Sequence, residues 1–189
     1  TIRQLMHHTS GYRDQWQLLA IAGWRLDDVI TKEQIMRLIE GQRELNFEPG
    51  SEYRYSNSGY SILARLVEKV SGKSFRQFAK ERIFKPLGMK DTHVHDDHER
   101  IVPNRAYSYR PDGLFYKKSV LSYANDGATS LFTTVEDMGK WMSNMLAPTL
   151  GESFIQKMRT KGKLNNGDVI NYGLGQSVNE YKGLSWAGH

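Results

Sequence analysis

The spacing of apolar residues predicts helices over most of the chain. Apolar side chains recur every three or four positions, and so share one face of a helix, in residues 31–44, 58–71, 74–85 and 134–147. Pairs typical of a capping box begin three predicted helices: Thr1 with Gln4, Thr31 with Gln34, and Ser74 with Gln77. Thr134 is the expected cap of another helix, while Gly72 and Pro86 mark two helix ends.

The helix expected after Thr134 carries a stripe of large side chains, which we assign to the core rather than to a cofactor site: Met138, Trp141, Met142 and Met145. A short helix is expected from Ser153 to Arg159. Residues 12–30 have no clear pattern. Residues 85–126 are polar, irregular and interrupted by three prolines, which favours an elaborate wall of a functional site.

The pattern changes near the end of the chain. Residues 169–175 and 184–187 are predicted to be strands, separated by a turn around Lys182 and Gly183. Helices followed by strands, without alternation between the two, indicate an α+β fold.

Composition excludes several classes of function. The chain has 189 residues, enough for one good-sized core or one lobe of a two-lobed enzyme. It has no cysteine, which excludes disulfides, thiolate zinc sites and cysteine nucleophiles. The net charge is +5, but the basic residues are scattered and no basic stripe alternates with aromatic residues, so we expect no nucleic-acid partner. No apolar run approaches the ~20 residues of a membrane span.

The triplet Tyr55-Ser56-Asn57 is the first candidate for chemistry. A tyrosine acts as a general base when a neighbouring cation lowers its pKa, and an amide offers a donor and an acceptor to a bound amide or ester. Alternate residues of an extended loop point the same way, so Tyr55 and Asn57 are expected to face one cleft. Taken alone the triplet is weak, because Asn57 is also a suitable helix cap.

Residues 93–98 match the H-x-H-x-D-H zinc signature of metallo-β-lactamases. The imidazoles of His93, His95 and His98, together with a carboxylate of the motif, would bind zinc, which would lower the pKa of a bound water. The context differs from that motif, since no apolar strand precedes it, no glycines follow it, and His189 is the only later histidine. We therefore favour a solvated polar loop here.

Two further arrangements resemble catalytic motifs only superficially. Gly183-Leu184-Ser185-Trp186-Ala187 is close to a nucleophile elbow, but only four residues follow Ser185, too few for the helix and the partners that an elbow needs. The run His7-His8-Thr9-Ser10-Gly11 places histidine and serine close together at the end of a predicted helix, and a helix C-cap explains it better than a nucleophile–base pair.

Several blocks, in order, resemble one known family: residues 1–11 (TIRQLMHHTSG), 47–51 (FEPGS), 55–60 (YSNSGY), 70–74 (VSGKS), 83–92 (IFKPLGMKDT), 127–138 (GATSLFTTVEDM), 172–175 (YGLG) and 188–189 (GH). The chain is similar to the serine β-lactamase/penicillin-binding protein family, in its class C-like branch of β-lactamases, esterases and D-peptidases. The resemblance covers essentially the whole chain, and its specificity comes from the joint order and spacing of the blocks.

The resemblance implies a β-lactamase/transpeptidase-like fold of α+β class. Residues 1–189 would form one such domain, truncated at both ends, with a helical lobe and loops over about 1–160 and the first returning strands of the antiparallel sheet over about 168–189. It also implies a serine hydrolase that acts through an acyl-enzyme on small-molecule or peptide amides or esters, without a cofactor or metal. A periplasmic or secreted location is suggested by the resemblance alone.

The resemblance assigns roles to three residues. Tyr55 takes the place of the catalytic base, Asn57 binds the substrate amide, and His189 is the first residue of a triad at the cleft edge. No serine in this chain has a lysine three residues later, so the nucleophile and its lysine of the S-x-x-K motif are expected outside it, and the chain itself is expected to be inactive. A non-catalytic relative that binds acyl ligands is the alternative, with the zinc hydrolase as a weaker one.

Overall fold

The computed structural model describes residues 1–120 and 122–189; Leu121, within the segment expected to be irregular, lies outside the described residues. The helices are α1 (Ile2–Met6), α2 (Gln15–Ile21), α3 (Lys32–Glu40), α4 (Asn57–Ser71), α5 (Phe75–Ala79), the π-helix η1 (Lys80–Phe84), α6 (Val135–Leu146) and α7 (Glu152–Arg159). The strands are β1 (Ile30–Thr31), β2 (His93–Val94), β3 (Tyr109–Asp112), β4 (Phe115–Lys118), β5 (Tyr123–Ala124), β6 (Leu131–Phe132), β7 (Ser177–Tyr181) and β8 (Leu184–Gly188).

The expected helix starts are confirmed. Thr1 and Thr31 form complete capping boxes with Gln4 and Gln34, and Thr134 accepts a hydrogen bond from the backbone of the third residue of α6. Helix α4 ends at Gly72, which has a left-handed φ of 67°. Among the described residues, no helix is long and apolar enough to cross a membrane.

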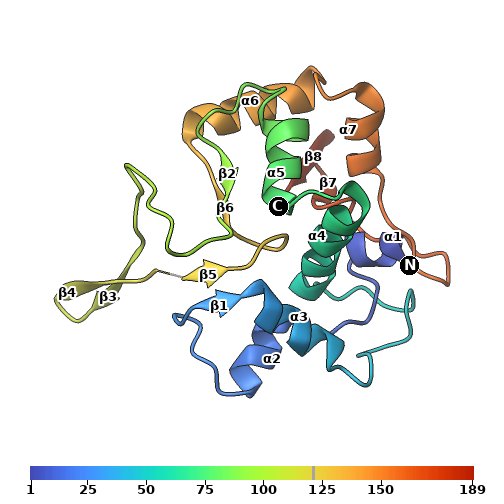
Figure 1. Cartoon of the computed structure of the whole chain (residues 1–189). Helices are drawn as coiled ribbons and strands as arrows, with labels where there is room; N and C mark the ends of the chain where they lie inside the picture. Colours follow the sequence, from blue (N-terminus) through green and yellow to red (C-terminus); the bar gives the residue numbers. More distant parts are fainter. Residues whose placement is uncertain (121) are drawn as a thin grey trace.

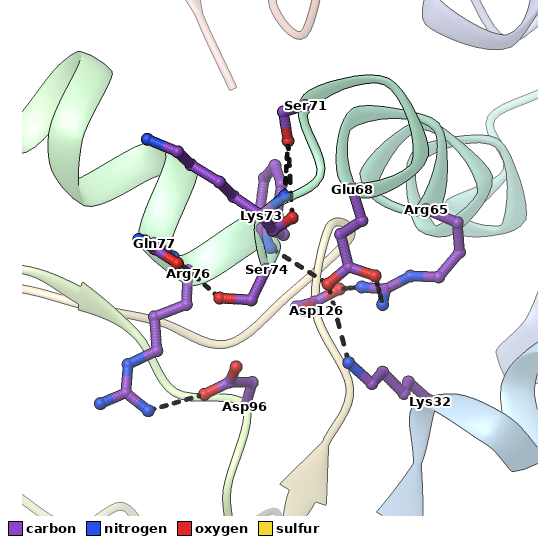
Figure 2. A network of polar contacts seen from close by, with 11 residues as sticks. Lys32, Arg65, Glu68, Ser71, Lys73, Ser74, Arg76, Gln77, Asp96 and Asp126 are labelled. Atoms are coloured by element: carbon purple, nitrogen blue, oxygen red, sulfur yellow. Dashed lines mark hydrogen bonds and ion pairs between the residues drawn. The ribbon is translucent and has the colours of Figure 1, made fainter.

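Helix α4 lies at the centre of the molecule, with α1 on one side and α2 and α3 on another (Figure 1). Beneath it, Leu19, Ile30, Ile35 and Ile39 form one apolar cluster. Ion pairs join α4 to distant segments, since Arg65 contacts both Glu68 and the buried Asp126, and Glu68 also lies 3.7 Å from Lys32 (Figure 2).

A second apolar cluster contains Ala79, Phe84, Met89 and Val94, and Trp141 of α6 packs against it. The expectation that the whole α6 stripe is core is wrong, because Met142 is 56% exposed. The inward face instead follows Asp137, Trp141 and Asn144, and the buried Asp137 is held by the Asp91 backbone N–H, the Thr92 hydroxyl and the Lys140 ammonium.

The strands form four two-stranded sheets within the described residues: β1 with β5 in parallel, and β2 with β6, β3 with β4, and β7 with β8 antiparallel. This mixture of helices and strands confirms the α+β class. The segment 85–126 is less irregular than expected, because it contains β2 and the β3–β4 hairpin, which extends away from the helices (Figure 1).

The expected strand at 169–175 is wrong, although the second strand and the turn before it are present. The paired strands are β7 and β8, and the turn residues Lys182 and Gly183 both have positive φ. Residues 169–175 make only isolated bridges. The chain bends there because the Gly173 N–H donates to the Gln176 carbonyl, Leu174 N–H donates to Met158, and Gly175 has a φ of 79°.

Candidate active site

The turn after α1 positions the loop that carries Tyr55. The carbonyls of His8, Thr9 and Gly11 accept hydrogen bonds from the backbones of Arg54 (3.0 Å), Gly50 (2.8 Å) and Asn46 (2.8 Å). Gly11 has a φ of +80°, and a Cβ there would lie 2.4 Å from the Phe47 carbonyl oxygen. The residues of this turn therefore act as a scaffold for the segment that follows them by about 40 positions.

Tyr55 and His189, 134 residues apart in the chain, meet at one end of this loop. The Tyr55 hydroxyl lies 3.2 Å from His189 Nε2, and the Tyr172 hydroxyl lies 3.2 Å from His189 Nδ1. Both ring nitrogens of His189 therefore have a tyrosine hydroxyl as partner, and the tautomer of the ring sets which hydroxyl donates. Tyr55 is 43% exposed, whereas Tyr172 is buried, so Tyr55 is the one of the two tyrosines that solvent or a ligand reaches.

The ring of His8 packs beneath Tyr55, with ring centroids 4.2 Å apart. Tyr60 and Tyr172 surround the same imidazole at 5.2 and 4.7 Å. His8 Nδ1 accepts a hydrogen bond from the Ser56 N–H at 3.2 Å, and burial lowers the pKa of His8 to about 4. His8 is therefore neutral at neutral pH and supports Tyr55 through packing.

The acid–base state of Tyr55 follows from its surroundings. Burial, followed by the negative charge of Asp14, raises the pKa of Tyr55 above its ordinary value. Burial also raises the pKa of Tyr60 to about 12, and that of Tyr172 further still. In this chain Tyr55 is thus a phenol at neutral pH, and a cation from elsewhere would be required for it to act as a base.

Asn57 is held by Asp14. One carboxylate oxygen of Asp14 accepts hydrogen bonds from the backbone N–H (2.7 Å) and the side-chain Nδ2 (2.6 Å) of Asn57. The other oxygen caps α2 by accepting from the backbones of Trp16 (2.9 Å) and Gln17 (3.4 Å). One N–H of Nδ2 is used by Asp14, so the second N–H and the side-chain oxygen of Asn57 remain as a donor and an acceptor for a ligand.

Asn57 does not cap α4, since the N-cap is Ser56, which makes no side-chain capping bond. The interpretation of Asn57 as a helix cap is therefore wrong. No role was expected from the sequence for Asp14, Tyr60 or Tyr172, and none for His8 beyond a local cap. An aspartate just before a helix is a recognisable cap, but its bond to Asn57 spans 43 residues and has no local signal.

The histidines of the zinc motif lie elsewhere, on and after β2. His95 is buried and stacks on Phe132 with centroids 4.2 Å apart, and its Nδ1 is 3.4 Å from His93 Nε2, while His98 is exposed. In residues 1–120 and 122–189, no three His, Cys, Asp or Glu side chains are grouped so that they could hold a metal ion.

Comparison with known proteins decides the family. A family model described as Beta-lactamase matches residues 1–189. The chain belongs to this family. A D-aminopeptidase of Brucella anthropi is 30% identical over all of this chain and 36% of its own length, and penicillin-binding protein 4* of Bacillus subtilis is 31% identical over 93% of the chain and 42% of its own.

Solved structures of the same fold also match this beta-lactamase-family chain. A D-stereospecific amidohydrolase from Streptomyces sp. has a TM-score of 0.78 at 23% identity, covering 100% of this chain and 60% of its own. The octameric penicillin-binding protein homologue from Pyrococcus abyssi has a TM-score of 0.79 at 23% identity, covering 100% of this chain and 46% of its own. The β-lactamase/transpeptidase-like fold is confirmed, and the chain spans about two fifths of the curated relatives' length.

Proposed function

We propose that this chain supplies the tyrosine and the substrate-binding asparagine of a serine acyl-transfer site that hydrolyses amides or esters. The observation that carries the proposal is that Tyr55 and Asn57, two residues apart, are each held by a residue from a distant part of the chain. Tyr55 is half-exposed and hydrogen-bonded to His189, and Asn57 is held two residues further on by Asp14. Such fixed polar groups are what a transient acyl intermediate requires.

This mechanism also requires a nucleophilic serine and a lysine. The serine hydroxyl would attack the acyl carbon and expel the amine or alcohol, and water would then release the acyl group. The lysine ammonium would lower the pKa of Tyr55, which the present surroundings raise. The side-chain amide of Asn57 would hydrogen-bond the substrate amide or ester, and His189 would hold the Tyr55 hydroxyl in place.

The substrate class follows from the relatives by analogy. A D-aminopeptidase, penicillin-binding proteins and a D-stereospecific amidohydrolase are similar to this chain, which supports an amide of a D-amino acid or a β-lactam. A non-catalytic relative that binds the same acyl ligands is the second candidate. Such a protein would keep Tyr55 and Asn57 as ligand contacts without the nucleophile.

Labelling with a fluorescent penicillin separates the two candidates. We expect covalent labelling of a polypeptide in which this chain follows its S-x-x-K segment, and loss of most labelling in its Tyr55→Phe variant. The 189-residue chain alone is the control and is expected to remain unlabelled. Reversible binding without covalent labelling would support the non-catalytic relative, and covalent labelling of the chain alone would overturn the assignment of the nucleophile.

A further inference from the structure

A hollow of about 850 Å³ lies between α5, η1, β6 and the loop at residues 100–106. Neither Tyr55 nor Asn57 lines it, so it is separate from the candidate active site. Its volume lies within the range of pockets that bind small molecules. Five basic residues line it, against the single carboxylate of Asp91: Arg76, Lys80, Lys90, Arg100 and Arg105. We call it the cationic hollow.

Most of these cations have no carboxylate partner. Arg76 pairs with Asp96 at 3.1 Å (Figure 2). No ion pair joins the other four to an acidic side chain anywhere in residues 1–120 and 122–189. Arg105 instead lies over the ring of Phe132, 4.8 Å from its centroid. Most of the positive charge of the hollow therefore has no ion-pair partner among the described residues.

The positive charge of the hollow contributes to a lowered pKa of two neighbouring histidines. Burial, and then the charge of Arg76, lower the pKa of His93, and burial followed by the charge of Arg105 lowers that of His95. Both imidazoles are thus kept neutral at neutral pH, and the hollow attracts anions through its arginines and lysines.

We propose that the cationic hollow binds a small organic anion that carries at least two negative charges on phosphate or carboxylate groups. The planar guanidinium groups of Arg100 and Arg105 suit the paired oxygens of such groups. Ile101, Val102 and Pro103, which also line the hollow, offer apolar contact to a carbon skeleton. This binding function is additional to acyl transfer and uses none of its residues.

Titration calorimetry with pyrophosphate, citrate and acetate tests the proposal. We expect saturable binding of pyrophosphate or citrate to the chain, and none of acetate. Tighter binding of pyrophosphate would indicate a phosphate ligand, and tighter binding of citrate would indicate a polycarboxylate. The double variant Lys90→Gln/Arg100→Gln should weaken binding about tenfold or more, because two charge-assisted contacts are lost. Both side chains are exposed, so the variant is expected to fold.

The matched control is Arg43→Gln/Lys69→Gln, which removes the same charge from exposed positions outside the hollow. It should bind like the unchanged chain. Equal weakening in both variants would mean general attraction to a basic protein, and absence of saturable binding would mean that no such site exists; either result overturns the proposal. No acylating probe is present, so failure here leaves the proposed acyl transfer untouched.

Discussion

Replacement of Asp14 is the most informative single perturbation of the candidate site. Its carboxylate accepts four hydrogen bonds, two from the start of α2 and two from Asn57. Asp14→Ala removes a helix cap, which costs about 1 kcal/mol. It also leaves two half-buried donors of Asn57 without a partner, at about 1 kcal/mol each. We expect a loss of about 3 kcal/mol in the free energy of unfolding.

Asp14→Asn separates the two roles. Asparagine caps a helix as well as aspartate does, but its amide nitrogen would then face the two donors of Asn57. We therefore expect a loss of about 2 kcal/mol from the second role alone. The side-chain amide resonances of Asn57 should shift in both variants, since their hydrogen-bond acceptor is removed.

Urea unfolding followed by circular dichroism measures these losses, provided that the m-value is unchanged. Asp27→Ala is the control: it removes an exposed carboxylate that pairs with the exposed Arg25 two residues away, and no change is expected. A loss of only about 1 kcal/mol for Asp14→Ala would refute the reasoning, because Asp14 would then be a helix cap and nothing more.

Three further substitutions test other contacts. Burial raises the pKa of Asp137, but hydrogen bonds from Lys140, Thr92 and the Asp91 backbone outweigh it and lower the pKa below 3.8. The ionised carboxylate therefore stabilises the folded chain above that pH, and this stabilisation is lost as the pH falls through the folded pKa. The stability difference between Asp137→Asn and the unchanged chain should therefore shrink between urea titrations at pH 7 and pH 3; an equal difference at both would contradict this. His8 has a folded pKa of about 4 against an ordinary 6.5, so stability should fall by about 3 kcal/mol from pH 7 to 4, and His8→Asn should flatten that fall. Gly11→Ala should cost about 3 kcal/mol or more by thermal unfolding, against about 1 kcal/mol for Gly23→Ala, because the two share a φ near +80° but only Gly11 faces a carbonyl; similar losses would rule out the clash.

Local signals in the sequence predicted local structure well. The capping residues Thr1, Thr31 and Thr134 each fix a helix start through bonds to residues three positions away, so their effect is legible without the fold. The failure at 169–175 has the opposite cause. Apolar alternation there indicates a strand, but the bend depends on the carbonyl of Met158, which a local pattern cannot reveal.

The candidate site shows the same division. Tyr55 and Asn57 were found through their blocks, and in the structure the Tyr55 hydroxyl lies 3.2 Å from His189 Nε2. Asp14 and Tyr172 were missed, because their contacts with Asn57 and His189 arise only in the folded chain. The roles of these residues in catalysis stay predictions until labelling and substitution test them.

Helix α4 makes the geometry of the site depend on contacts that form late in folding. Its contacts through Asn57, Tyr60 and Arg65 reach partners 43, 54 and 61 residues away. Contacts between such distant segments form only after large loops have closed, late in folding. Amide protons of the first turns of α4 should accordingly exchange with solvent only through global unfolding. A short peptide around Tyr55 would carry the residues of the site without its geometry.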